Sequence, residues 1–310
     1  MALHVIVGKG PVGSTTAEEL VSRGHEVRVL SRNGGQSTEA IEHRQVDATD
    51  AGALAEAARG AAALYNAVNP AYSRWATDWP PVAAALLTAA ERTGAVLVTM
   101  SNLYGYGRPS GPMTPETPLG ATDAKGRVRK QMWADALAAH QAGRVRVTEA
   151  RASDFVGPQV PLGQSHLMRQ LPALRKGSRA WVIGDPDVRR SWGYMPDVAA
   201  TLATLGTDER ALGRAWHVPS APPRSQRRAL EELASAMGAP PARVSGIPWP
   251  VLRAVGVAVP FLREVVAMRH QFDQEFVVDA SATTATFGIA ATPWDEVVAA
   301  TAGAAMASNA

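Results

Sequence analysis

The 310-residue sequence has a formal charge of only +3, from 31 lysine and arginine residues against 28 aspartate and glutamate residues, and 46% of its residues are hydrophobic. This composition is typical of a globular protein with one large core, or with one core and a smaller lobe, and no long basic run predicts a nucleic-acid partner. The absence of cysteine excludes disulfides, thiolate catalysis and cysteine metal sites. Without a signal sequence or a stretch of 18 apolar residues, we expect a cytoplasmic protein with no membrane partner.

The first predicted unit is a strand, a glycine turn and a helix. The apolar run His4–Val7 leads into a Gly-x-Gly-x-x-Gly motif, and residues 15–24 follow as a helix that ends at a glycine. Such glycines make the turn, let backbone amides approach a pyrophosphate and let the helix pack on the strand. The helix N-terminus then favours phosphate groups. The predicted cofactor loop contains Gly8, Gly10, Pro11, Val12 and Gly13.

A second strand, Glu26–Arg32, completes a β-α-β unit, and its end indicates which dinucleotide is bound. NAD-binding units usually place a carboxylate there to accept hydrogen bonds from the ribose 2′-hydroxyl group. Here Ser31 and Arg32 offer a hydroxyl and a guanidinium, which suit a 2′-phosphate. The sequence therefore predicts NADP(H) rather than NAD(H). The alternative is that Arg32 is a solvated loop cation.

The following segments continue the alternation of strands and helices. They predict an α/β fold, a Rossmann-type doubly wound parallel sheet whose ligands lie beyond the carboxyl ends of the strands. The expected strands are 44–50, 61–68, 95–100 and 145–151, and the expected helices are 51–59, 81–93 and 125–142.

Beyond residue 157 the alternation fades, which predicts a second, smaller lobe over the substrate. Helices are expected at 225–237 and at 250–269, the latter broken at Pro260. We expect an NADP(H)-binding Rossmann domain over residues 1–155. Residues 156–310 then form mainly the substrate lobe, with a stretch at about 190–220 returning to the Rossmann domain.

Three further motifs carry a resemblance to a known family: Ser101–Gly107, Arg151–Pro158 and Trp192–Ala199. With the glycine motif, they resemble the extended short-chain dehydrogenase/reductase superfamily, the NAD-dependent epimerase/dehydratase proteins. The resemblance implies a small-molecule substrate and a homodimer. It also implies that Asp47 and Ala48 flank the adenine, that Ala67 and Asn69 pass beside the ribose and phosphates, and that Ala152 and Ser153 complete the cofactor site.

The family's usual Tyr-x-x-x-Lys pair is broken in this sequence. Lys130 stands where the lysine is expected, and Gly126 stands four residues earlier. The usual serine position is Met100 or Asn102, depending on the tyrosine from which it is counted. The candidate catalytic residues are therefore Lys130, Tyr104, Tyr106, Asn102 and Asp154.

Each of these candidates also has a structural alternative. Tyr104 or Tyr106 can pack under the loop, Asp154 can cap backbone amides, and Lys130 can belong to a solvated cationic helix face. Tyr72, Trp75, Phe155 and Trp192 are the expected substrate-pocket residues, with core packing as the alternative. No paired histidine spacing indicates a metal.

Three functions fit these observations. The first is an NADP(H)-dependent reductase or epimerase that acts on a carbonyl or hydroxyl group of a small organic metabolite with an unusual proton donor. The second is a redox-sensing regulator that binds NADP(H) without turnover, as NmrA-like relatives do. The third is a dehydratase or lyase that uses the nicotinamide transiently.

Overall fold

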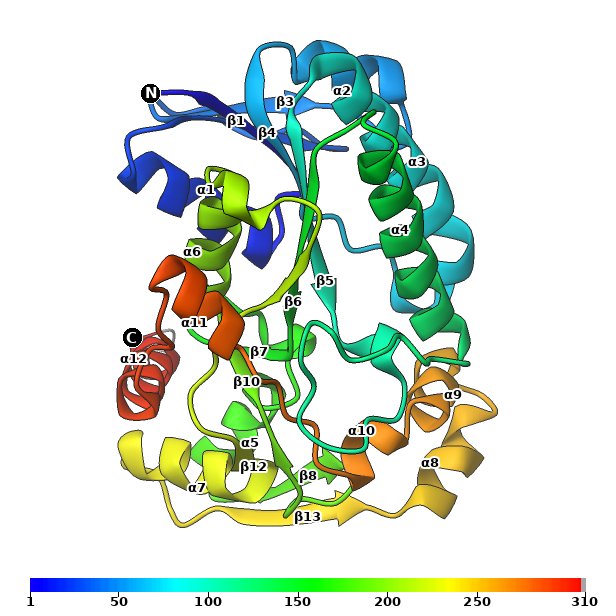
Figure 1. Ribbon diagram of the computed structural model, residues 1–310. Helices are drawn as coiled ribbons and strands as arrows, with labels where there is room; N and C mark the ends of the chain where they lie inside the picture. Colours follow the sequence, from blue (N-terminus) through cyan, green and yellow to red (C-terminus); the bar gives the residue numbers. More distant parts are fainter. Residues whose placement is uncertain (308–310) are drawn as a thin grey trace.

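A seven-stranded parallel sheet forms the centre of the computed structural model, which describes residues 1–307 (Figure 1). The strand order is β11-β6-β5-β4-β1-β2-β3, with the chain reversing direction across the sheet between β1 and β4. This confirms the Rossmann-type doubly wound fold. The strands are β1 (Leu3–Val7), β2 (Glu26–Ser31), β3 (Ile41–Gln45), β4 (Ala61–Asn66), β5 (Val96–Asn102), β6 (Val147–Ala152) and β11 (Ala215–His217).

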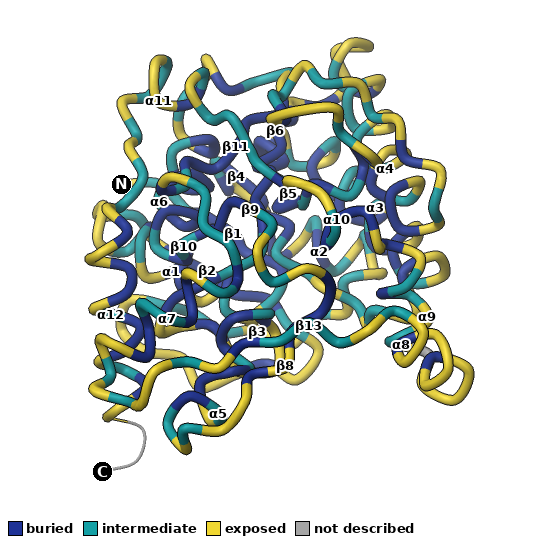
Figure 2. Tube along the Cα trace, turned by 90° about the horizontal axis from the view of Figure 1, so that it is seen from below, coloured by how far each residue is buried: buried dark blue, intermediate teal, exposed yellow. Residues whose placement is uncertain are grey.

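Helices cover both faces of this sheet (Figure 1). On one face α1 (Pro11–Ser22) packs against α6 (Met195–Leu205). On the other, α3 (Trp75–Thr93) lies between α2 (Ala51–Ala57) and α4 (Ala124–Gln141). The strands β1, β4, β5, β6 and β11 are mostly buried between the two layers, as inner strands of a parallel sheet must be, whereas the edge strand β3 is partly exposed (Figure 2).

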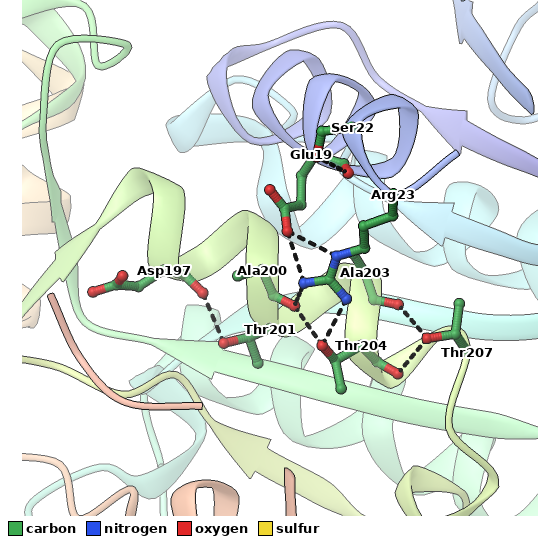
Figure 3. Close-up of polar contacts among 9 residues, drawn as sticks. All are labelled: Glu19, Ser22, Arg23, Asp197, Ala200, Thr201, Ala203, Thr204 and Thr207. Carbon is green, nitrogen blue, oxygen red and sulfur yellow. Dashed lines mark hydrogen bonds and ion pairs between the residues drawn. The ribbon is translucent and has the colours of Figure 1, made fainter. Parts of the chain in front are cut away.

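The contact between α1 and α6 holds the helix that follows the glycine loop. The Arg23 guanidinium donates to the Glu19 carboxylate at 2.8 Å, to the Thr204 hydroxyl at 2.9 Å and to the Ala200 carbonyl at 3.2 Å (Figure 3). These bonds connect the end of α1 to the last turns of α6. A segment nearly two hundred residues later in the chain thus fixes the first β-α unit.

The second lobe lies below the carboxyl ends of the strands in Figure 1 and contains short strand pairs with helices around them. The strand β11 returns from this half of the chain to pair with β6. The lobe's pairs are β7 (Asp154–Val156) with β10 (Trp192–Tyr194), β9 (Arg189–Arg190) with β12 (Arg224–Ser225), and β8 (Arg179–Ile183) with β13 (Arg243–Ile247). Its helices are α5 (Leu171–Arg175), α7 (Gln226–Ala236), α8 (Trp249–Gly256), α9 (Pro260–Ala267), α10 (His270–Asp273), α11 (Ser281–Phe287) and α12 (Trp294–Ala307).

The third strand and helix α3 differ most from the sequence expectation, and helix α1 begins at Pro11, four residues before its expected start. The third strand spans 41–45 rather than 44–50, because it pairs with β2 from Val27 to Ser31 and the chain then turns toward α2. Helix α3 begins at Trp75, six residues before the expected start, and continues through Pro80 and Pro81. The fully buried Trp79 and nearly buried Trp75 anchor this first turn although the prolines remove helix hydrogen bonds. No helix within residues 1–307 is both long and apolar enough to cross a membrane.

Candidate functional site

A cavity of about 920 Å³ extends along the carboxyl ends of β1, β2, β4, β5 and β6 and ends under the second lobe. Its position is the one at which parallel α/β sheets bind ligands. It brings together most of the residues predicted from the sequence. Those that line it are Gly8, Gly10, Pro11, Val12, Ser31, Arg32, Asp47, Ala48, Ala67, Asn69, Tyr72, Trp75, Asn102, Tyr104, Ala152, Ser153, Asp154 and Phe155.

The glycine loop at one end leaves room for a phosphate group. Gly8 has a φ of +111°, and a Cβ atom there would lie 2.5 Å from the Ala67 carbonyl oxygen. A Cβ at Gly13 would overlap the Gly8 carbonyl, so Gly13 serves packing and does not line the cavity. A Cβ at Gly10 would meet nothing within 4 Å. Gly10 begins α1, whose N-terminus has no side-chain cap among residues 1–307, so its amide groups are available to an anion.

The end of β2 next to this loop is cationic. Arg32 is exposed and lines the cavity, and Lys9 Nζ donates to the Gly34 carbonyl oxygen at 2.7 Å. The Ser31 hydroxyl donates to the same carbonyl at 2.9 Å. On the opposite wall, hydrogen bonds from Thr49, together with the Arg32 charge, hold the pKa of Asp47 below its usual range. These residues lie at the end of the cavity where this fold holds the adenosine half of a dinucleotide.

Two tyrosines meet at the other end of the cavity. The hydroxyl groups of Tyr72 and Tyr104 share a hydrogen bond. The Tyr104 backbone is fixed because its amide donates to Asn102 Oδ1 at 3.1 Å. Burial raises the pKa of Tyr104 to about 12, although the nearby guanidinium groups of Arg190 and Arg129 oppose the rise. Tyr104 therefore keeps its proton at neutral pH next to cations that stabilise its anion.

On α4, Arg129 faces the cavity and Lys130 does not. Lys130 is exposed, because one residue beyond Arg129 the helix has turned by about 100°. The Arg129 guanidinium lies 4.7 Å from the Trp75 ring and 4.4 Å from the Trp79 ring. Burial lowers the pKa of Arg129 to about 10, which leaves it charged at neutral pH, and its Nε atom has no hydrogen-bond partner among residues 1–307. The α4 cation that lines the cavity is thus Arg129, and the predicted Lys130 does not line it.

Lys125 stands one helical turn before Arg129, on the same face of α4. Its ammonium group lies 4.1 Å from the centre of the Tyr72 ring and forms a buried ion pair with Glu264 of α9 at 2.5 Å. Gly126 cannot be the site of a missing tyrosine, because a Cβ atom there would lie 2.6 Å from the Tyr104 carbonyl oxygen. Lys125 and Arg129 are both buried and are four residues apart, which is also the spacing of the Tyr-x-x-x-Lys pair.

Asp154 lies beside these groups, at the start of β7. Its carboxylate forms an ion pair with the buried Arg190 and lies 3.9 Å from His166. Burial lowers the pKa of His166 to about 4, so this histidine is neutral at pH 7. Asp154 thus has a cationic partner and is not an isolated base. Within residues 1–307 no group of three or more histidine and acidic side chains could hold a metal ion.

Two other predicted residues lie away from the cavity. Tyr106 is buried, and its hydroxyl lies 2.7 Å from His217 Nε2 and accepts a hydrogen bond from Arg151 at 2.7 Å. Trp192 is buried as well, and its indole N–H donates to the Arg224 carbonyl at 3.1 Å. Both side chains pack the core, which is the alternative that the sequence left open.

Sequence reasoning missed Arg129, Lys125 and Arg190. For the α4 pair a signal existed, since Lys125 and Arg129 have the (i, i+4) spacing that places two side chains on one helix face. Counting four residues back from Lys130 leads to Gly126 and so does not identify this pair. For Arg190 no local signal existed, because its pairing with Asp154 depends on how the second lobe folds back.

Comparisons with known proteins agree with this geometry. The model of the NAD-dependent epimerase/dehydratase family matches residues 5–218. A dTDP-glucose 4,6-dehydratase from Bacillus anthracis in complex with NAD superposes with a TM-score of 0.81 at 14% identity, covering 99% of this chain and 97% of that one. A UDP-glucose 4-epimerase from Thermotoga maritima gives 0.82 at 12% identity, covering 99% and 100%. The dTDP-glucose 4,6-dehydratase of Streptomyces venezuelae with NAD bound gives 0.79 at 18% identity, covering 98% and 97%. No match was found among curated protein sequences.

Proposed function

Since the chain belongs to the NAD-dependent epimerase/dehydratase family, we propose that it is a nicotinamide-dependent oxidoreductase or epimerase acting on a carbonyl or hydroxyl group of a small organic metabolite. One observation carries the proposal. A single cavity connects the glycine loop at Gly8–Val12 with Tyr104, Arg129 and Asp154. A phosphate-binding loop and a buried acid–base cluster in one cavity are what hydride transfer requires.

In this proposal Tyr104 is the proton donor. A bound nicotinamide dinucleotide would supply the hydride to a substrate carbonyl carbon, or take it from the corresponding alcohol. The Tyr104 hydroxyl would give its proton to the carbonyl oxygen, and Arg129 and Arg190 would stabilise the tyrosinate that remains. The hydrogen bond with Tyr72 offers a path for a proton to return to Tyr104.

The preferred cofactor in this proposal is NADP(H). Arg32 and the absence of a carboxylate at the end of β2 support it. The similar solved structures described above contain NAD, which makes NAD(H) the direct competitor in any binding measurement.

A sensing role without turnover is the second candidate. It is favoured by helix α4, which lacks the family's Tyr-x-x-x-Lys pair and whose buried Lys125 is already paired to Glu264. A dehydratase or lyase, like an epimerase, returns the nicotinamide to its starting redox state in each cycle, and it differs from the sensor because it converts a substrate.

Oxidation of NADPH with a panel of aldehydes and ketones separates a reductase from a sensor. Replacing Tyr104 by phenylalanine should lower kcat by about 10²–10⁴-fold while leaving the Kd for NADPH within about twofold. Tyr194 does not line the cavity, so Tyr194→Phe is the matched control and should keep wild-type activity. Equal rates for wild type and Tyr104→Phe would contradict the assigned role. If no compound in the panel is reduced and one redox state of the cofactor binds tightly, the sensor is favoured over the reductase.

A further inference from the structure

A second, apolar groove of about 290 Å³ adjoins the catalytic end of the main cavity. It runs between the strand pair β8–β13 and the helices α8 and α9. The two spaces share the lining residues His166, Arg169 and Phe261. A molecule held in the main cavity can therefore extend into the groove.

The groove exposes large apolar side chains to solvent. Trp181 is 52% exposed, Val251 49%, Val255 44% and Phe261 37%. The segment from α8 to α9 lies at the edge of the molecule and is largely exposed (Figure 2). Apolar surface gathered in one concave place is typical of a binding site. The remaining apolar lining residues are Ile183, Ile247, Leu252 and Leu262.

Most polar groups of the groove are bonded to the protein itself, and Gln226 Oε1 has no partner among residues 1–307. Gln170 donates to the Trp181 carbonyl and Gln226 to the Ile183 carbonyl, each at 2.9 Å. The Arg169 guanidinium donates to the Ser165 carbonyl at 3.0 Å and to the Gly163 carbonyl at 3.1 Å. The His166 ring meets the Phe272 ring edge to face at 5.0 Å, and His166 is neutral at pH 7 because burial lowers its pKa to about 4. The groove thus lacks the directed cations that a nucleoside diphosphate requires.

We propose that this groove binds the aliphatic tail of the substrate, whose carbonyl or hydroxyl head lies at Tyr104. A direct line of contacts supports the arrangement. The Phe261 ring at the junction lies 5.5 Å from the Tyr72 ring, and Tyr72 hydrogen-bonds to Tyr104. The position of the head group rests on the proposed function, whereas binding of the tail does not.

Binding of straight-chain alcohols to the NADPH-loaded protein tests the groove without turnover, because an alcohol cannot be reduced further. Dissociation constants of 1-butanol, 1-hexanol, 1-octanol and 1-decanol are measured by calorimetry and by tryptophan fluorescence. Each added methylene group should tighten binding by about fourfold until the groove is filled. A Kd independent of chain length would overturn the proposal.

Matched variants test whether the dependence of Kd on chain length arises in the groove. Val251→Asp and Val255→Asp place a charge in the groove at half-exposed positions and should abolish the dependence on chain length. Val257→Asp, at a position 85% exposed and outside the lining, should keep it. Retention of the dependence in both groove variants, or its loss in all three, would reject the groove as the site. Absence of NADPH turnover alongside intact chain-length dependence would reject only the proposed function.

Discussion

Replacing Gly10 by alanine should weaken dinucleotide binding and leave the fold intact, whereas the same replacement at Gly13 should destabilise the fold itself. Gly10 has φ −74° and ψ −177°, which alanine adopts without strain, and its Cβ would enter open space in the cavity. The methyl group would then stand where a phosphate must approach the loop. At Gly13 the methyl group would overlap the carbonyl of Gly8, which has no room to move because it packs beside Ala67.

The two substitutions should change different quantities, the Kd for NADPH in Gly10→Ala and the free energy of unfolding in Gly13→Ala. For Gly10→Ala the free energy of unfolding should change by less than about 1 kcal/mol, since the entropic gain of alanine offsets its poorer capping. Loss of one hydrogen bond to a charged phosphate costs about 1.5–3 kcal/mol, so the Kd for NADPH should rise about 10- to 150-fold. For Gly13→Ala the overlap should lower the free energy of unfolding by about 1–3 kcal/mol before any cofactor is added.

Chemical denaturation of the cofactor-free variants and calorimetric titration with NADPH measure the two quantities separately. Unchanged NADPH affinity in Gly10→Ala would refute the placement of the phosphates at this loop. A Gly13→Ala variant as stable as wild type would refute the close packing between this glycine and Gly8.

Three other outcomes follow from the site and the core. Arg32→Ala should weaken NADPH by at least tenfold and NADH by less than twofold in a fluorescence titration, and equal losses would reject the 2′-phosphate role. Burial lowers the pKa of His4 and of His217 to about 4. Below pH 6.5 these two histidines therefore bind protons in the unfolded chain, whereas in the folded chain they stay neutral down to about pH 4. Urea denaturation should accordingly show the free energy of unfolding falling from pH 7 to pH 4, by on the order of 3 kcal/mol for each group, and a flat profile would contradict their burial in the neutral form. Glu264→Gln should cost about 1–3 kcal/mol of stability by leaving the buried Lys125 ammonium unpaired, and adding Lys125→Met should recover most of it; no recovery would show that the ion pair is not the cause.

The sheet could be predicted from the sequence because its signals are local. Each buried strand is a short apolar run, and the glycine motif at Gly8–Gly13 fixes where the first strand turns into a helix. The start of α3 could not be predicted, because Pro80 and Pro81 argue against a helix and only the tertiary packing of Trp75 and Trp79 outweighs them.

The site was predictable at its cofactor end and much less so at its catalytic end. The loop residues follow from spacing along one β-α-β unit. The contacts of Tyr104 with Tyr72, and of Lys125 with Glu264, join segments that lie 32 and 139 residues apart, which no periodicity reveals. The apolar groove likewise depends on how α8 and α9 fold back onto β8 and β13.

Calorimetric titration of the purified protein with NADPH and with NADH tests the central claim most directly. The site predicts saturable binding of one dinucleotide per chain, with NADPH bound more tightly than NADH. In Gly10→Ala the Kd for NADPH should rise about 10- to 150-fold. Absence of binding for both cofactors at micromolar protein would contradict the claim that this cavity holds a nicotinamide dinucleotide.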